Sequence, residues 1–170
     1  MLHQTKQKVF SGLMVLPAKR LERINSSLAK QAQITLIPTL HAKKPKQSRE
    51  TRGLLSRTLL PIADQSGNVF WYLDGGMLFN HNTDIVDNIR DLVYGKGTLP
   101  ERSIGTVTLF LDNIRISTNV PMDLFPKDNN KPNRALGTLV SDEVYQQVLI
   151  EGQTWINRAF VLNDWYISGY

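Results

Sequence analysis

Two long apolar segments separated by a short turn constrain the fold of this 170-residue chain more than any other feature. The segments RGLLSRTLLPIAD and VFWYLDGGMLF are rich in residues that favour strands, and DQSGN between them is typical of a turn. Gly75 and Gly76 in the second segment indicate a bulge or a close approach of two backbones. We therefore expect two neighbouring strands of a mostly antiparallel sheet.

The segment before these strands has a helical pattern. Pro17 suits a first helical turn, and Leu21, Ile24 and Leu28 recur at three- and four-residue spacing through about Lys30. This stripe predicts one helix that packs on a sheet. QITLIPTLHAK then predicts a strand that a proline interrupts or confines to an edge.

A second helix is predicted after the strands. Asn82 or Thr83 can cap its start, and Gly95 and Gly97 end it. Its predicted apolar face consists of Ile85, Ile89, Leu92 and Val93.

The rest of the chain contains further strand patterns. GTVTLFLDNIRISTNV alternates like one long strand or two, and PMDLFPKDNNKPN is a turn-rich surface segment. Residues 136–167 predict two more strands joined near Glu151 and Gly152. The order of elements indicates a single α+β domain over residues 1–170, with two main helices on a mostly antiparallel sheet.

The net charge of +5 comes from one segment of the chain. Residues 41–57 hold six basic residues and one acid, and the remainder holds 14 of each. Three interpretations remain open for this segment: a solvated surface, a nucleic-acid or protein-interaction surface, or a steering surface for an anionic metabolite. No aromatic residue lies in it, which argues against a base-stacking platform. The candidate steering residues are Lys43, Lys44, Lys46, Arg49 and Arg52.

Several kinds of chemistry are excluded or disfavoured. The chain has no cysteine, and GKGTLPERSIG lacks the spacing of a phosphate-binding Walker loop. His3, His41 and His81 are too far apart to suggest a metal site. We therefore expect neither a metal nor an organic cofactor.

The N-terminal apolar run is short, is broken by Gly12 and is followed by Pro17 and basic residues instead of a cleavage site. No apolar segment approaches the ~20 residues that span a bilayer. These features predict a cytoplasmic protein that does not contact a membrane.

Arg57 is a candidate anion site because Leu54, Leu55, Leu59 and Leu60 surround it in the sequence. A guanidinium in an apolar strand is costly to bury unless a carboxylate meets its planar fork. The partner is either a ligand or an internal carboxylate, for which the candidates are Asp64, Asp74 and Glu101; outward projection of the side chain is the other alternative.

The segments RTLLPIAD, GKGTLPERSIG and IEGQTWINRAFVL, in this order, resemble chorismate lyase (chorismate pyruvate-lyase), whose UTRA-like fold also serves as the ligand-binding domain of some GntR-type regulators. The resemblance spans about residues 20–165. It implies that Arg57 holds a ligand carboxylate and that Leu99 closes over the ligand. Asp64 and Trp71 fall where the following turn and strand of the family lie.

One departure from the family affects the expected activity. The glutamate that serves the elimination in this family falls on Ala159, and Glu151 lies on the wrong side of the hairpin glycine to replace it. Without that carboxyl group, general-acid help worth ~10²- to 10⁴-fold is missing. Asn157 and Arg158 lie nearby, and strand alternation turns one of them inward.

The sequence therefore predicts a protein that binds a small aromatic carboxylate through Arg57, Leu99, Asn157 and Arg158. Elimination of pyruvate from chorismate to give 4-hydroxybenzoate is the reaction that the resemblance implies. The alternative is a non-enzymatic nucleic-acid or protein-interaction module that uses residues 43–57. The sequence does not define the catalytic residues or the oligomeric state.

Overall fold

Antiparallel pairs make up all the sheets in the part of the chain that the computed structural model describes, which is residues 8–95, 98–99, 105–122 and 133–170. The elements follow the order β1, α1, α2, β2 to β5, α3, β6, β7, α4, a short π-helix η1, β8 and β9. The α+β class with mostly antiparallel sheets is confirmed.

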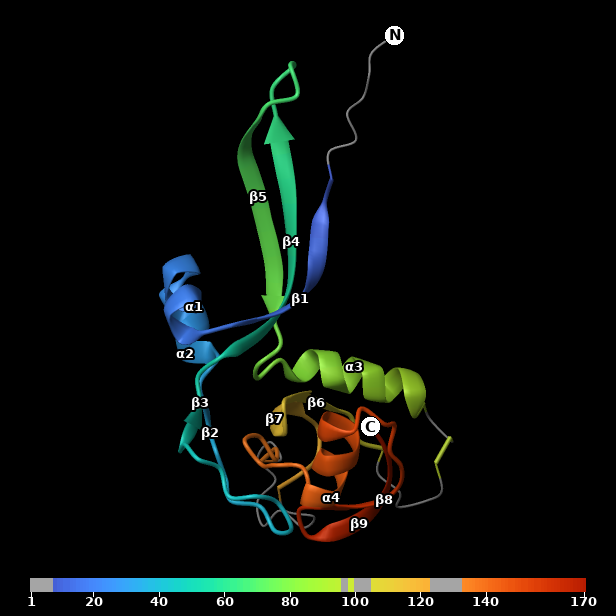
Figure 1. The fold of residues 1–170 in the computed structure, drawn as a ribbon. Coiled ribbons are helices and arrows are strands. Elements are labelled where there is room, and N and C mark those ends of the chain that lie inside the picture. The colour runs from blue at the N-terminus through green and yellow to red at the C-terminus, as the bar shows by residue number, and fades with distance from the viewer. Residues whose placement is uncertain (1–7, 96–97, 100–104, 123–132) are drawn as a thin grey trace.

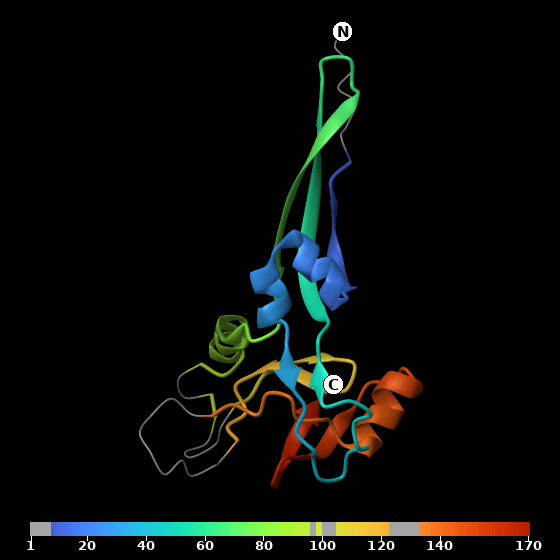
Figure 2. The same cartoon turned by 90° about the vertical axis from the view of Figure 1, so that its left-hand side faces the viewer.

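The largest sheet has three strands in the order β1–β4–β5. It consists of β1 (Phe10–Leu16), β4 (Gly53–Ala63) and β5 (Val69–Leu78). The two strands predicted around DQSGN are therefore confirmed as β4 and β5, with a register shift between Ile62 and Ala63 near the turn. Figures 1 and 2 show this sheet extending away from the part of the protein that contains β6 to β9.

The helical segment after β1 forms two short helices, α1 (Ala18–Ile24) and α2 (Ser26–Gln31), instead of the single predicted helix. The break falls at Asn25, whose backbone is extended and whose side chain accepts a hydrogen bond from the backbone N–H of Ser27 at 2.9 Å. Asn25 thus caps the second helix where the apolar spacing alone suggests continuity. Both helices lie beside the base of the three-stranded sheet in both views.

The base of the sheet packs on these helices through a small apolar cluster. Its buried members are Leu16, Leu21, Ala32, Leu55 and Leu78. The strand predicted after Gln33 is limited to the two residues of β2 (Ile34–Thr35), which pairs with β3 (Arg49–Glu50).

Asn80 connects the end of the sheet to the rest of the protein. Its side chain is fully buried and accepts a hydrogen bond from the backbone N–H of Leu54 at 3.0 Å. Its amide nitrogen donates to the carbonyl oxygens of Ala32 and Arg52 at 2.9 and 3.0 Å. This one side chain therefore joins the start of β4 and the backbone before it to the end of the α2 region.

The second predicted helix is confirmed as α3 (Thr83–Val93), and Asn82 is its N-cap, accepting from the backbone N–H of Ile85 at 3.3 Å. Its predicted apolar face is only partly correct. Val86 is the fully buried residue of the helix, whereas Leu92 is 85% exposed. Ile85 also packs on the main apolar cluster, so the prediction fails only for the last turn, where Leu92 and Val93 are exposed.

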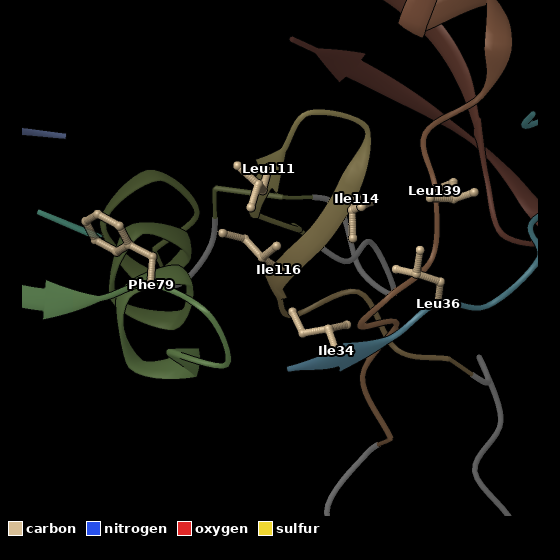
Figure 3. Close-up of a cluster of buried hydrophobic side chains, with 7 residues drawn as sticks. All are labelled: Ile34, Leu36, Phe79, Leu111, Ile114, Ile116 and Leu139. Carbon is tan, nitrogen blue, oxygen red and sulfur yellow. The ribbon is translucent and has the colours of Figure 1, made fainter. Parts of the chain in front are cut away.

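The next strands form a hairpin of β6 (Thr108–Leu111) and β7 (Ile114–Thr118), which is one of the two alternatives that the sequence left open. All five residues of β7 are buried. This hairpin supplies much of the main apolar cluster, which Figure 3 shows. The cluster consists of Ile34, Leu36, Phe79, Leu111, Ile114, Ile116 and Leu139.

The C-terminal region differs from its prediction. Residues 142–150 are helical, as α4 (Asp142–Val144) followed by the π-helix η1 (Tyr145–Ile150). The final two strands, β8 (Ile156–Val161) and β9 (Asp164–Gly169), are joined at residues 162–163 and not near Glu151. The β-branched and aromatic residues of this stretch favour strands by propensity, but tertiary packing of Val144 in a buried cluster overrides that preference.

Candidate functional site

A cavity of about 1020 Å³ lies among the C-terminal elements. Its walls come from the end of α3, the β6–β7 hairpin, α4 with η1, and the β8–β9 hairpin. This volume is at the upper end of the range typical of small-molecule sites. The arrangement brings together segments that are up to about 75 positions apart, from Tyr94 to Tyr170.

Arg115 is the principal charged group of this cavity. It lies on β7 between Ile114 and Ile116, it is 1% exposed, and it lines the cavity. Burial lowers the pKa of this guanidinium, and Tyr170 opposes that effect. An arginine side chain nevertheless remains protonated in proteins, so the cavity wall carries a buried positive charge.

The hydrogen bonds of Arg115 leave part of its guanidinium unused. Nη1 donates to the hydroxyl of Thr138 at 2.9 Å and to the carbonyl of Leu139 at 3.2 Å, whereas Nε is buried with no hydrogen-bond partner in the described structure. The ion pairs found among the described residues do not include Arg115. A buried cation with an N–H that lacks an acceptor is energetically unfavourable.

Aromatic and polar side chains complete the lining. The phenol of Tyr166 has a raised pKa because of burial and, to a smaller extent, because of Asp164. Asp112, in the β6–β7 turn, also lines the cavity. The aromatic lining residues are Tyr94, Phe110, Tyr145, Trp165, Tyr166 and Tyr170. Such walls suit a flat apolar ligand body.

Arg57 does not line this cavity. It lies on β4 opposite Gly76, and its guanidinium forms a two-pronged ion pair with Asp74, in which Nε contacts Oδ1 at 2.8 Å. This contact matches the internal carboxylate that the sequence left open as an alternative. The ion pair also explains the shift of the Asp74 pKa below its usual value.

The other residues predicted as ligand contacts are dispersed. Leu99 lines the cavity, next to the end of α3. Asn157 and Arg158 are both exposed on β8, where Arg158 lies over the Trp165 ring with 5.7 Å between its guanidinium carbon and the ring centroid. Ala159 is buried in an apolar cluster, so its position carries no polar group. Of the predicted set, the structure thus brings only Leu99 to the cavity wall.

Two residues of the basic segment, residues 41–57, contact side chains near the cavity. Arg52 binds the buried carboxylate of Glu50 at 2.7 Å and Asp112 at 2.8 Å. The backbone N–H of Lys43 donates to Asp142, and its Nζ lies 5.3 Å from the centroid of the Tyr145 ring. Lys44, Lys46 and Arg49 are exposed.

The described residues contain neither a membrane-spanning helix nor a metal-binding cluster. No helix described in residues 8–95, 105–122 or 133–170 is long and apolar enough to cross a membrane. Within the same parts of the chain, no group of three or more His, Asp and Glu side chains is placed to hold a metal ion. His3, Glu101 and Arg102 lie outside the described residues.

The structure is an α+β fold with one large cavity among the described C-terminal elements. The model of the family described as single cache domain 3 matches residues 77–170, which is more than half of the chain, and the chain therefore belongs to this family. All the cavity-lining residues fall within the matched range. Neither a curated protein nor a solved structure matches the chain.

This family assignment corrects three predictions. The resemblance to chorismate lyase is wrong, and with it the implied elimination of pyruvate from chorismate, because single cache domains are ligand-sensing domains. The alternative of a basic nucleic-acid or protein-interaction module is replaced on the same ground. The cytoplasmic location is also wrong, since cache domains are typically extracellular or periplasmic. The predicted small-molecule partner agrees with the family.

The sequence contains a signal for Arg115. The argument applied to Arg57, that a guanidinium among aliphatic residues needs an anionic partner, applies equally to Arg115 in the sequence NIRISTNV. Alternation along a strand does not reveal which of two such arginines lies on a buried strand. Only the tertiary structure shows that β7 is buried on both faces, whereas β4 is partly exposed.

Proposed function

We propose that this chain binds a small organic anion in the cavity, with Arg115 as the anchor for its carboxylate and the aromatic wall as the contact for an aromatic body. The proposal assigns the domain the role of a receptor for such a ligand. The single observation that supports it most strongly is the buried guanidinium of Arg115, a residue that lines the cavity and has no carboxylate partner among the described residues.

A carboxylate suits this group for geometric and electrostatic reasons. It is planar and offers two oxygen acceptors, which match the two parallel N–H groups of a guanidinium. Charge-assisted bonds are about twice as strong as neutral ones, and they strengthen further in a buried site. Binding would also compensate the burial of the cation, which lacks a carboxylate partner among the described residues.

The basic segment supports a steering role in the same proposal. Lys43 contacts Tyr145 and Arg52 contacts Asp112, and both of these contacted residues line the cavity. Exposed cations near the mouth of a site raise the rate at which anions arrive, and salt weakens that effect. We include Lys44, Lys46 and Arg49 in this surface.

A thermal-unfolding series tests the proposal with benzoate, cyclohexanecarboxylate and acetate as anionic probes and benzamide as the neutral control. A probe at ~100 times its Kd adds ~2.7 kcal/mol, which raises the midpoint by ~5 to 10 °C in a domain of this size. We expect benzoate to raise the midpoint and benzamide to leave it unchanged.

Two arginine variants locate the site. Arg115→Met should abolish the benzoate shift, and Arg57→Met, on the three-stranded sheet and bound to Asp74, should keep it. A shift that survives Arg115→Met and disappears in Arg57→Met would move the anion site to β4. No shift with any of the three carboxylates would refute the proposed ligand class.

A further inference from the structure

One face of the three-stranded sheet is apolar and is not covered by any part of the chain that the structure describes. Residues that pair across β1, β4 and β5 share a face, because cross-strand partners point to the same side. The pairs Leu13–Ser56–Met77, Leu60–Leu73 and Ile62–Trp71 therefore lie on one face. The opposite face carries the ion pair of Arg57 with Asp74, and α1 and α2 cover its base.

We call the first of these the open face and define it by seven large apolar side chains and three small hydroxyl residues. The apolar side chains are exposed by 38% to 70%. They are Leu13, Val15, Leu60, Ile62, Trp71, Leu73 and Met77. The hydroxyl residues are Ser11, Ser56 and Thr58.

Two of the three hydroxyl groups of the open face are hydrogen-bonded to each other. The hydroxyls of Ser11 and Thr58 bind each other across β1 and β4 at 2.8 Å, so they lose little when they are covered. Gly75 lies beside Thr58, and a Cβ added there would meet nothing within 4 Å. The face therefore has a shallow centre of small residues between two apolar ends, and it carries no charged side chain.

The exposed parts of the seven apolar side chains amount to roughly 700 to 800 Å², which is about what one partner buries in a standard protein interface. Soluble monomers rarely expose apolar patches above a few hundred Å². We infer that the open face is a dimer interface, in which two copies of this chain pack their sheets face to face around a two-fold axis near Thr58. This inference is independent of the proposed ligand.

A second copy fits this surface for two reasons. A two-fold interface brings the same patch of each copy together, so the open face must be complementary to itself. Without charged side chains it meets no like-charge repulsion in that arrangement, and the apolar end at Leu13 and Met77 meets the partner's apolar end at Leu60 and Leu73. Packed sheets lie about 10 Å apart with interdigitating side chains, which matches this pattern.

Sedimentation equilibrium over a range of protein concentrations tests the inference. We expect a species of twice the chain mass for the wild-type protein. Leu73→Glu should raise the Kd of the dimer at least 100-fold. The matched control is Tyr72→Glu, which changes the neighbouring residue of β5 on the opposite face and is similarly exposed, at 58% against 61%. This control should dimerise like the wild type. Circular dichroism of both variants establishes that each is folded.

A chemical cross-link provides a second measurement that does not destabilise the face. Because the chain has no cysteine, Thr58→Cys creates a single thiol near the proposed axis. A short bis-maleimide reagent should link two copies of this variant, and it should not link Tyr72→Cys. Three outcomes would overturn the inference. The wild-type protein could be a monomer, Leu73→Glu and Tyr72→Glu could weaken the dimer equally, or a monomer could bind phosphatidylcholine vesicles through this face.

Discussion

Replacing Arg115 with methionine should make the ligand-free protein more stable. The free protein keeps a guanidinium at 1% exposure without an ion-pair partner among the described residues. Replacement of buried ionic groups by apolar residues of similar volume is often neutral or stabilising, by about 1 to 4 kcal/mol. Methionine is close to arginine in length and adapts to irregular space, which limits the cavity that the change creates.

The hydrogen bonds that the variant loses reduce this gain. Thr138 keeps a partner, because its hydroxyl also donates to the carbonyl of Ala135 at 2.7 Å. The carbonyl of Leu139 loses the 3.2 Å contact from Nη1, which costs about 1 kcal/mol. We therefore expect a net gain of up to about 3 kcal/mol, or an increase in Tm of up to ~10 °C for a domain of this size.

Urea denaturation at neutral pH without added anions measures this change. The matched control is Arg134→Met, since Arg134 binds Asp87 at 2.7 and 3.0 Å. Removing a paired arginine should destabilise the protein by about 1 kcal/mol, a value discounted for the partial exposure of the pair. A loss of more than 1 kcal/mol in Arg115→Met would refute the reasoning, because it would show that the cation is satisfied within the folded chain.

Three further changes test other parts of the structure. Gly137 has a φ of +76° and a Cβ added there would collide with the carbonyl of Thr35, so Gly137→Ala should lower the free energy of unfolding by at least ~2 kcal/mol in urea denaturation, and a neutral effect would contradict the close approach of these backbones. Asn82→Ala removes the N-cap of α3 and should cost ~0.5 to 2 kcal/mol in the same assay, whereas Asn82→Asp should keep most of the stability. Burial opposes ionisation of Glu50, but hydrogen bonds from Arg52 and nearby backbone N–H groups outweigh it and lower the pKa of this carboxyl group. The carboxylate therefore contributes to the free energy of unfolding above its ordinary pKa of 4.5, and this contribution is lost as the pH falls through the lower pKa of the folded state. Unfolding free energies measured between pH 3 and 7 should therefore depend less on pH in Glu50→Gln than in the wild type, and identical slopes would exclude this carboxylate as a source of acid sensitivity.

Local patterns predicted the elements that depend mainly on neighbouring residues. The turn between β4 and β5, the strands beside it and the N-cap at Asn82 follow from short-range preferences. The split between α1 and α2 was missed because Asn25 caps a helix within a continuous apolar pattern. The helical residues 142–150 were missed because tertiary packing overrides their strand propensity.

The sequence predicted the kind of side chain at the candidate site, an arginine on an apolar strand, but not which arginine it is. The expectation that an arginine on an apolar strand meets an anion applies to Arg57, which binds Asp74, and to Arg115, for which no carboxylate lies within ion-pair distance in the described regions. The difference between them depends on which strand is buried between other elements. That information lies in contacts between distant segments, such as the hydrogen bond from the backbone N–H of Arg115 to the carbonyl of Thr138 at 3.0 Å.

The central claim is that a small carboxylate binds at the guanidinium of Arg115. Its most direct test is a nuclear magnetic resonance titration of the wild-type protein with benzoate, in which the Nε–H signals of the arginines are followed and Arg115→Lys assigns the signal of Arg115. We expect the Arg115 signal to move in a saturable way, because a carboxylate binds beside its guanidinium, and the Arg57 signal to stay in place. Saturable binding of benzoate without any change of the Arg115 signal would contradict the claim.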